Sequence, residues 1–165
     1  MIKTGIGQDS HRIQEPSNGK ALMLAGVRLD ESYSLEGNSD SDVILHAITN
    51  AISGISGNPI LGPVADGLCK AGVTDSTAYL RLALADLFTT GYHLAHVSVA
   101  VECQRPKILP KLPELRINLA ALLSLTVADI GITATSGEGL TDFGKGLGVQ
   151  AFAVVTAALR SAAGG

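Results

Sequence analysis

The chain has 165 residues, 46% of them hydrophobic and 16% charged, with a formal net charge of −3. This length allows one domain with a substantial core and is too short for two, so we expect a single domain over residues 1–165. Scattered Lys and Arg residues without a basic stripe argue against a nucleic-acid partner, and no apolar run reaches the ~20 residues of a membrane span.

The predicted elements alternate between strands and helices, which favours an α/β layered domain. A strand over residues 2–7 leads into a polar turn, Gln8 to His11, and residues 21–29 form a second strand. Apolar residues at helical spacing predict the first helix over residues 39–55. Residues 58–73 are rich in glycine and proline and are predicted to be a loop.

The second half of the chain continues this alternation. We expect helices over residues 75–90 and 112–125 and strands over residues 97–101 and 130–136. A loop over residues 137–148 holds five glycines. The last predicted element is an apolar segment, residues 149–159, that reads as a strand or, given its alanines, as a helix.

The cysteines and the start of the chain bear on its compartment. Cys69 and Cys103 lack CxxC spacing, and the first residues lack the long apolar core of a signal peptide. We expect reduced thiols and a cytoplasmic location, or the plastid stroma if a transit peptide has been removed. With so few charges to cover its surface, the chain is also expected to bury part of that surface between subunits.

The first candidate site is a metal centre. Asp9 and His11 point to one side of an extended segment, and His46 lies near the start of the predicted helix. Two histidines and one aspartate would leave the fourth tetrahedral position open, as a catalytic zinc requires. The alternative is that Asp9 caps a turn and His46 is a core histidine.

Two further segments could bind a ligand. Around the glycine-rich loop, backbone N–H groups together with Thr135, Ser136 and Lys145 could donate hydrogen bonds to an anion such as phosphate. The acidic Glu138 is compatible with such a site if a hard cation bridges its carboxylate to the phosphate oxygens. Residues 104–110 form a proline-stiffened connection that could offer its backbone to a planar ligand. Without other information, a simple turn and a simple connector are the more common structures for such segments.

Together these segments resemble the 2-C-methyl-D-erythritol 2,4-cyclodiphosphate synthase family nearly end to end. The resemblance rests on four stretches: GIGQDSHRI, SDSDVILHAITNAISG, CQRPKILPKLPELR and ITATSGEGL. It implies a two-layer α/β fold, with a mixed four-stranded sheet carrying helices on one face. The sheets would pack around the axis of a homotrimer whose active sites lie between subunits.

The resemblance also assigns roles to matching positions. Zinc would be held by Asp9, His11 and His46, and Glu138 would bind a second divalent cation, magnesium or manganese. Thr135 joins these four as a catalytic residue. The substrate would be bound by Asn38, Ser39, Asp66, Lys107, Ile108, Leu109, Thr135, Ser136 and Lys145. Lys107 to Leu109 would receive the cytosine.

The implied reaction is an intramolecular phosphoryl transfer. It converts 4-diphosphocytidyl-2-C-methyl-D-erythritol 2-phosphate into the cyclic diphosphate and CMP, which makes the enzyme a phosphorus–oxygen lyase. Two alternatives remain open from the sequence. One is a zinc-dependent phosphohydrolase in which water attacks instead, and the other is a non-catalytic trimer that binds metal and nucleotide.

Three positions depart from the family pattern. Asn38 stands where a histidine is usual, so it can still donate to phosphate but cannot be cationic. Pro59 replaces an aspartate that contacts the ribose, and Lys145 replaces an arginine near the trimer axis. The unusual loop at Asp142 and Phe143 puts any ligand of the central trimer cavity in doubt.

Overall fold

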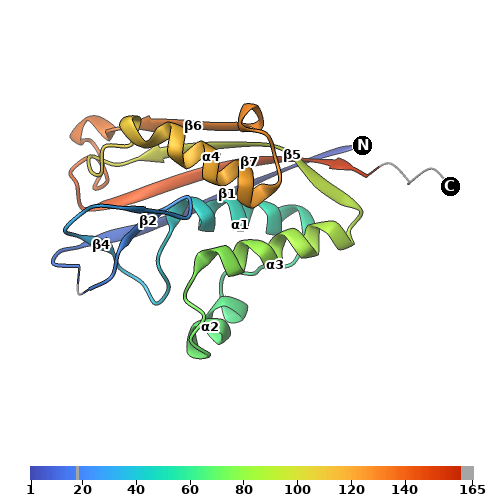
Figure 1. Ribbon diagram of the computed structural model, residues 1–165, viewed down its shortest axis with the longest axis horizontal. Coiled ribbons are helices and arrows are strands. Elements are labelled where there is room, and N and C mark those ends of the chain that lie inside the picture. The colour runs from blue at the N-terminus through green and yellow to red at the C-terminus, as the bar shows by residue number, and fades with distance from the viewer. Residues whose placement is uncertain (18, 161–165) are drawn as a thin grey trace.

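The computed structural model describes residues 1–17 and 19–160, so the last five residues of the predicted domain lie outside the described part. A mixed five-stranded sheet, in the order β4-β1-β7-β5-β6, forms one layer and helices form the other (Figure 1). The strands are β1 (Ile2–Gln14), β4 (Ser34–Leu35), β5 (Tyr92–Glu102), β6 (Ile130–Thr135) and β7 (Gly148–Leu159). The helices are α1 (Val43–Ser56), α2 (Pro63–Lys70), α3 (Ser76–Thr89) and α4 (Leu112–Leu123).

Shorter elements connect these layers. A separate hairpin is formed by β2 (Leu22–Leu24) and β3 (Val27–Leu29), and three 3₁₀ turns are η1 (Leu109–Lys111), η2 (Val127–Asp129) and η3 (Gly137–Gly139). No helix of the described residues is long and apolar enough to span a membrane. One layer of strands and one layer of helices confirm the expected two-layer α/β fold.

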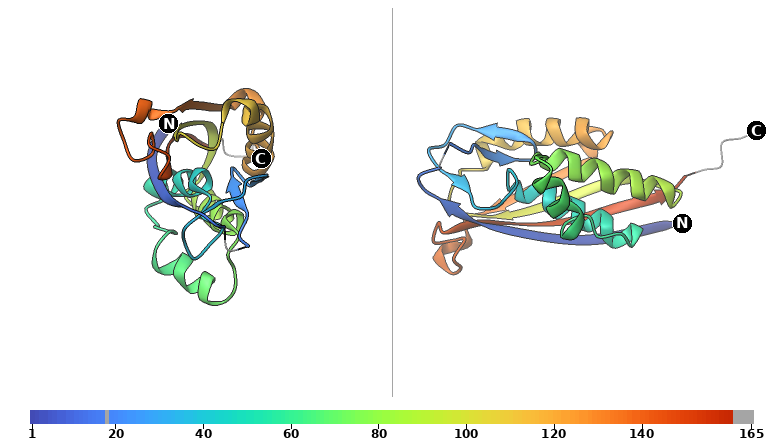
Figure 2. Two further views of the ribbon diagram at one scale, coloured as in Figure 1. Left: turned by 90° about the vertical axis from the view of Figure 1, so that its left-hand side faces the viewer. Right: turned by 90° about the horizontal axis from the view of Figure 1, so that it is seen from below.

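The sheet is mixed, as predicted. β7 runs antiparallel to both β1 and β5, and β5 runs parallel to β6. Figure 2 shows β1 and β7 side by side along the length of the molecule. The four long strands match the predicted number, and the two-residue β4 adds a fifth where Leu35 pairs with Ile13.

Three predicted elements need correction. β1 continues through the predicted turn to Gln14, because the polar residues after Gly7 still alternate between two sides of a strand. Residues 21–29 form the hairpin β2–β3, turned by Ala25 and Gly26 at positive φ. The predicted loop 58–73 contains α2, a helix that buries only Ala65 and so leaves little apolar pattern.

One face of the sheet carries the core. The buried residues of β5 and β7 alternate along each strand and face α1, while α3 packs on α1 and α4 on β6 (Figure 1). The last predicted element, which could have been a strand or a helix, is therefore the strand β7, because only a strand buries alternate residues in this way. The opposite face leaves Ile6, Phe152 and Val154 exposed.

Two glycines let β1 lie directly on α1. A Cβ at Gly5 would be 2.0 Å from the carbonyl oxygen of Ala51, and one at Gly7 would be 2.1 Å from that of Ala47. No side chain fits at such distances. The contact brings the next two residues on this side of β1, Asp9 and His11, to the first turn of α1.

Candidate active site

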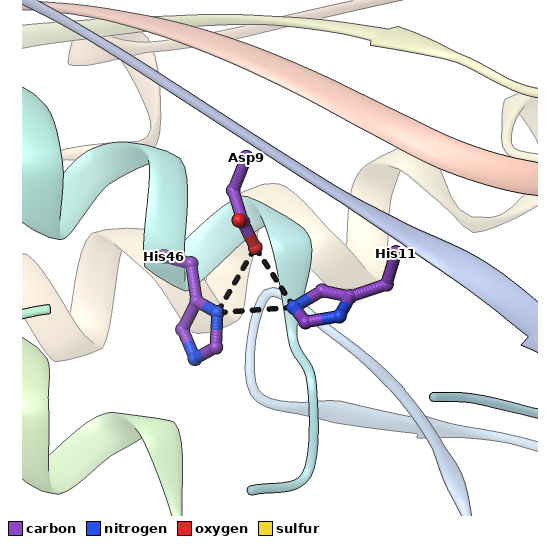
Figure 3. Close-up of side chains that lie close together, drawn as sticks. All are labelled: Asp9, His11 and His46. Carbon is purple, nitrogen blue, oxygen red and sulfur yellow. Dashed lines mark hydrogen bonds and ion pairs between the residues drawn. The ribbon is translucent and has the colours of Figure 1, made fainter. Parts of the chain in front are cut away.

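Asp9, His11 and His46 converge on a single point, as predicted (Figure 3). Oδ2 of Asp9 lies 3.0 Å from Nδ1 of His46 and 3.1 Å from Nε2 of His11. The two ring nitrogens are 3.5 Å apart. All three side chains are at least partly withdrawn from solvent, and His46 is buried.

Regular secondary structure positions all three groups. Asp9 and His11 share the helix-facing side of β1 with Gly7, because alternate residues of a strand point the same way. His46 lies one turn into α1, where its N–H donates to the carbonyl of Asp42 at 2.9 Å. Asp42 in turn caps the helix by accepting from the N–H groups of Ile44 and Leu45.

The electrostatics favour a carboxylate between two histidines. Burial by itself would raise the pKa of Asp9, but the hydrogen bonds and charge of His11 and His46 outweigh it and lower the pKa to about 2. Asp9 is therefore ionised throughout the neutral range. Its negative charge gives the cluster an attraction for a cation.

The geometry fits a tetrahedral metal ion. Ligand atoms about 2.0–2.1 Å from zinc and at tetrahedral angles are separated by roughly 3.3 Å. The three separations here, 3.0, 3.1 and 3.5 Å, bracket that value. One carboxylate and two imidazoles are also a donor set that catalytic zinc sites use, with the fourth position left for a ligand.

A second group of predicted residues lines one cavity of about 360 Å³. Its walls include Lys107, Ile108 and Leu109 on one side and Thr135 and Ser136 on the other. The wall also contains Gln104, the first residue of the predicted ligand-binding segment 104–110, and Cys103, which was not predicted from the sequence. Such a volume is within the range of small-molecule pockets.

The hydroxyl groups at the end of β6 have their oxygens engaged and their protons free. Oγ1 of Thr135 accepts from the N–H of Gly137 at 3.2 Å, and Oγ of Ser136 accepts from the N–H of Glu138 at 3.4 Å. Glu138 itself is exposed and has a positive φ of 51°. Both hydroxyls can therefore donate to an anion near Glu138.

The remaining predicted residues lie elsewhere on the chain. Asn38 and Asp66 line a separate cavity of about 490 Å³ with Cys69 and Lys70. Oγ of Ser39 accepts from the N–H of Ser41, so this hydroxyl shapes its own loop. Lys145 is paired with Asp142 at 3.6 Å within the glycine-rich loop.

The chain thus carries the predicted residues in separate places. The cavity at Lys107 and Thr135 includes none of the three metal-site residues, nor does the cavity at Asn38 and Asp66. Asp40 and Ser76, which lie behind His46, were not predicted from the sequence. Nothing in the sequence indicates that contact, because it joins residues 36 positions apart.

Comparison with known proteins gives one consistent answer. The YgbB family model matches residues 2–158. The chain is 48% identical over 159 residues to the 2-C-methyl-D-erythritol 2,4-cyclodiphosphate synthase of Chlamydia caviae. The matched region covers 96% of this chain and 90% of that protein.

Solved structures agree. A 2C-methyl-D-erythritol-2,4-cyclodiphosphate synthase in its CDP-bound form has a TM-score of 0.82 and 31% identity, over 94% of this chain and 100% of that one. A CDP complex of IspF from Plasmodium falciparum also has a TM-score of 0.82, with 25% identity and 97% of each chain covered.

Proposed function

Because the chain belongs to the YgbB family, we propose that it catalyses the reaction of the cyclodiphosphate synthases that it resembles. It converts 4-diphosphocytidyl-2-C-methyl-D-erythritol 2-phosphate into 2-C-methyl-D-erythritol 2,4-cyclodiphosphate and CMP. The 2-phosphate attacks the β-phosphorus of the same molecule, and CMP leaves. The observation that carries the proposal is the convergence of Asp9, His11 and His46 (Figure 3).

The main obstacle to this reaction is charge. Nucleophile and electrophile are both anionic, and each pair of unit charges ~4 Å apart repels by about 4 kcal/mol at an effective dielectric near 20. Zinc at Asp9, His11 and His46, with magnesium or manganese at Glu138, would neutralise this charge and polarise the attacked phosphorus. The protein needs no general base, since the attacking phosphate oxygen is already ionised.

The cavity beside Thr135 suits the nucleotide half of the substrate. Ile108 is buried and Lys107 stands at the rim with its ammonium 3.2 Å from the carbonyl of Gln104. This mixture of apolar walls and a few polar groups is typical of small-molecule sites. The free protons of the Thr135 and Ser136 hydroxyls would then hold phosphate oxygens next to Glu138.

The remaining rate enhancement comes from the positioning of the substrate. Holding the two ends of one substrate molecule in contact converts the reaction into a step with a high effective concentration. The chain does this by binding the cytidine end at Lys107 to Leu109 and the phosphate ends between Glu138 and the metal centre. We expect Asp66 to contact the methylerythritol part and Asn38 to donate to a phosphate, from the separate cavity that both residues line.

A homotrimer accounts for the separation of these groups on one chain. The uncovered sheet face exposes large apolar residues on adjacent strands, with Ile6 paired to Val154. A contiguous exposed apolar face of this kind is typical of a protein–protein interface. A neighbouring copy that covers it would also bring its cavity at Thr135 toward this chain's metal centre. We place the working enzyme in the cytoplasm, or in a plastid stroma.

One assay tests the proposal. The purified enzyme is given the diphosphocytidyl substrate with magnesium, and the products are followed by phosphorus NMR. Formation of the cyclic diphosphate and CMP is the expected result. A linear phosphate product would point to a phosphohydrolase, and no turnover would point to a binding protein; either result contradicts the synthase.

A further inference from the structure

His46 is held from behind by two residues that do not touch the candidate metal position. Its Nε2 atom lies 2.8 Å from Oγ of Ser76, and that Oγ is hydrogen-bonded to Oδ1 of Asp40. The backbone N–H of Ser76 donates to the other carboxylate oxygen, Oδ2, at 3.0 Å. Ser76 is fully buried, so water does not compete for these bonds.

The hydrogens of this chain of contacts can run in only one direction. An ionised carboxylate accepts hydrogen bonds and has none to donate, so the proton of the Ser76 hydroxyl points to Asp40. The hydroxyl oxygen then presents a lone pair to His46, and Nε2 must carry a hydrogen to bond with it. A neutral imidazole protonated at Nε2 has its free lone pair at Nδ1, the atom that faces Asp9 and His11.

We propose that Asp40 acts through Ser76 as a positioning residue that fixes His46 in the tautomer required to bind zinc through Nδ1. This inference rests on the zinc site of the proposed function and adds residues that touch neither metal nor substrate. Partners of this kind, behind a ligating histidine, orient the ring and raise metal affinity. The contact also ties the metal centre to the first turn of α3, where Ser76 is the first helical residue.

Replacing the carboxylate of Asp40 by an amide tests this role. Oδ1 of Asp40 also accepts from the N–H of Asp42 at 3.2 Å, so the stability of the variant is measured beside its zinc affinity. In Asp40→Asn, the amide oxygen must stay on the Ser76 N–H, which places the NH₂ group against the Ser76 hydroxyl. The hydroxyl then turns its proton toward Nε2, which favours the opposite tautomer of His46. If the amide is flipped, its NH₂ group faces the backbone N–H of Ser76, so two donors oppose each other. Either arrangement opposes zinc binding while the shape of the side chain is preserved.

A matched control is available next to Ser76. Asp75 is the N-cap of α3 and accepts from the N–H of Thr77 at 2.8 Å. Asp75→Asn makes the same chemical change at the residue that precedes Ser76, and asparagine also caps helices well. It leaves the Ser76 hydroxyl untouched. A general effect of losing a charge near α3 would appear in both variants.

The test is zinc affinity, measured by competition with a chromophoric chelator on the apo form of the full chain. We expect Asp40→Asn and Ser76→Ala to bind zinc 10- to 100-fold more weakly than wild type, and Asp75→Asn to stay within about twofold. The thermal unfolding midpoint of each apo protein checks the fold. Wild-type affinity in Asp40→Asn would overturn the proposal.

A second measurement covers the case in which the variants fold poorly. NMR of the zinc-loaded wild type, with ¹⁵N-labelled histidine, should show an exchange-protected proton on Nε2 of His46. A proton on Nδ1 instead would overturn the proposal. A wild type that binds no zinc contradicts the metal centre and this inference together, whereas tight wild-type binding with Asp40→Asn unchanged contradicts only the inference.

Discussion

Gly7 of β1 faces the carbonyl oxygen of Ala47 in α1, at a distance that leaves no room for a side chain: a Cβ on residue 7 would lie 2.1 Å from that oxygen. The contact sets the depth at which the strand lies on the helix. Two residues further along β1 is Asp9, and one residue before Ala47 is His46. The spacing of Asp9, His11 and His46 therefore depends on a glycine that is not itself one of the three candidate metal ligands.

We predict that Gly7→Ala destabilises the fold and impairs the metal site together. The methyl group must push β1 away from α1, and such overpacking costs about 1–3 kcal/mol or more of unfolding free energy. Chemical denaturation of the apo protein measures the first effect, and chelator competition measures the weaker zinc binding. Gly67→Ala is the control, because nothing lies within 4 Å of a Cβ at this position in α2. It should be neutral or slightly stabilising.

The three candidate metal ligands can be tested directly. His46→Ala should reduce bound zinc from one ion per chain to a trace and abolish formation of the cyclic product, because two remaining ligands cannot complete the site. Metal analysis of dialysed protein is the measurement. His93→Ala, at an exposed histidine of β5, should retain full zinc and activity. Full zinc content in His46→Ala would rule out its role as a ligand.

The sequence predicted the convergence of Asp9, His11 and His46 better than it predicted the elements that carry them. The Asp-x-His spacing indicated Asp9 and His11 because i and i+2 share a side in any extended segment, whether in a turn or within β1. The strand itself was missed beyond Gly7, since polar residues there replace the apolar alternation that marks a strand. The Ser76–Asp40 contact behind His46 was out of reach, because only the packing of α3 on α1 creates it.

The uncovered sheet face makes a prediction about assembly. Val154→Asp places a charge on this face, at a side chain that is 40% exposed in one chain, and should convert a trimer into monomers because a buried unpaired charge is costly. Sedimentation velocity reads the change in mass. Leu82→Asp, on the outer helix α3 and also 40% exposed, is the matched control and should leave the assembly intact. A trimeric Val154→Asp would show that this face is not the interface.

The N-cap of α1 makes a prediction about pH. Asp42 is fully buried and accepts from four backbone N–H groups, those of Ala25, Gly26, Ile44 and Leu45. Burial raises the pKa of its carboxyl group to about 6; these hydrogen bonds oppose the rise and the nearby charge of Asp40 adds to it. The carboxyl thus ties the β2–β3 hairpin to the helix and holds its proton more tightly in the folded state than in the unfolded chain.

The sign of the effect follows from proton binding. Because the folded pKa lies above the unfolded value of 3.8, the contribution of this proton to stability is complete below about pH 4 and is lost as the pH rises through 6. The loss approaches 3 kcal/mol, at about 1.4 kcal/mol per pKa unit. Asp42→Asn lacks this titration. Urea unfolding of both apo proteins, with a chelator present, should show the stability of wild type relative to Asp42→Asn falling between pH 4 and 7. A difference that stays constant over this range would mean that the carboxyl is ionised in the folded protein at pH 4.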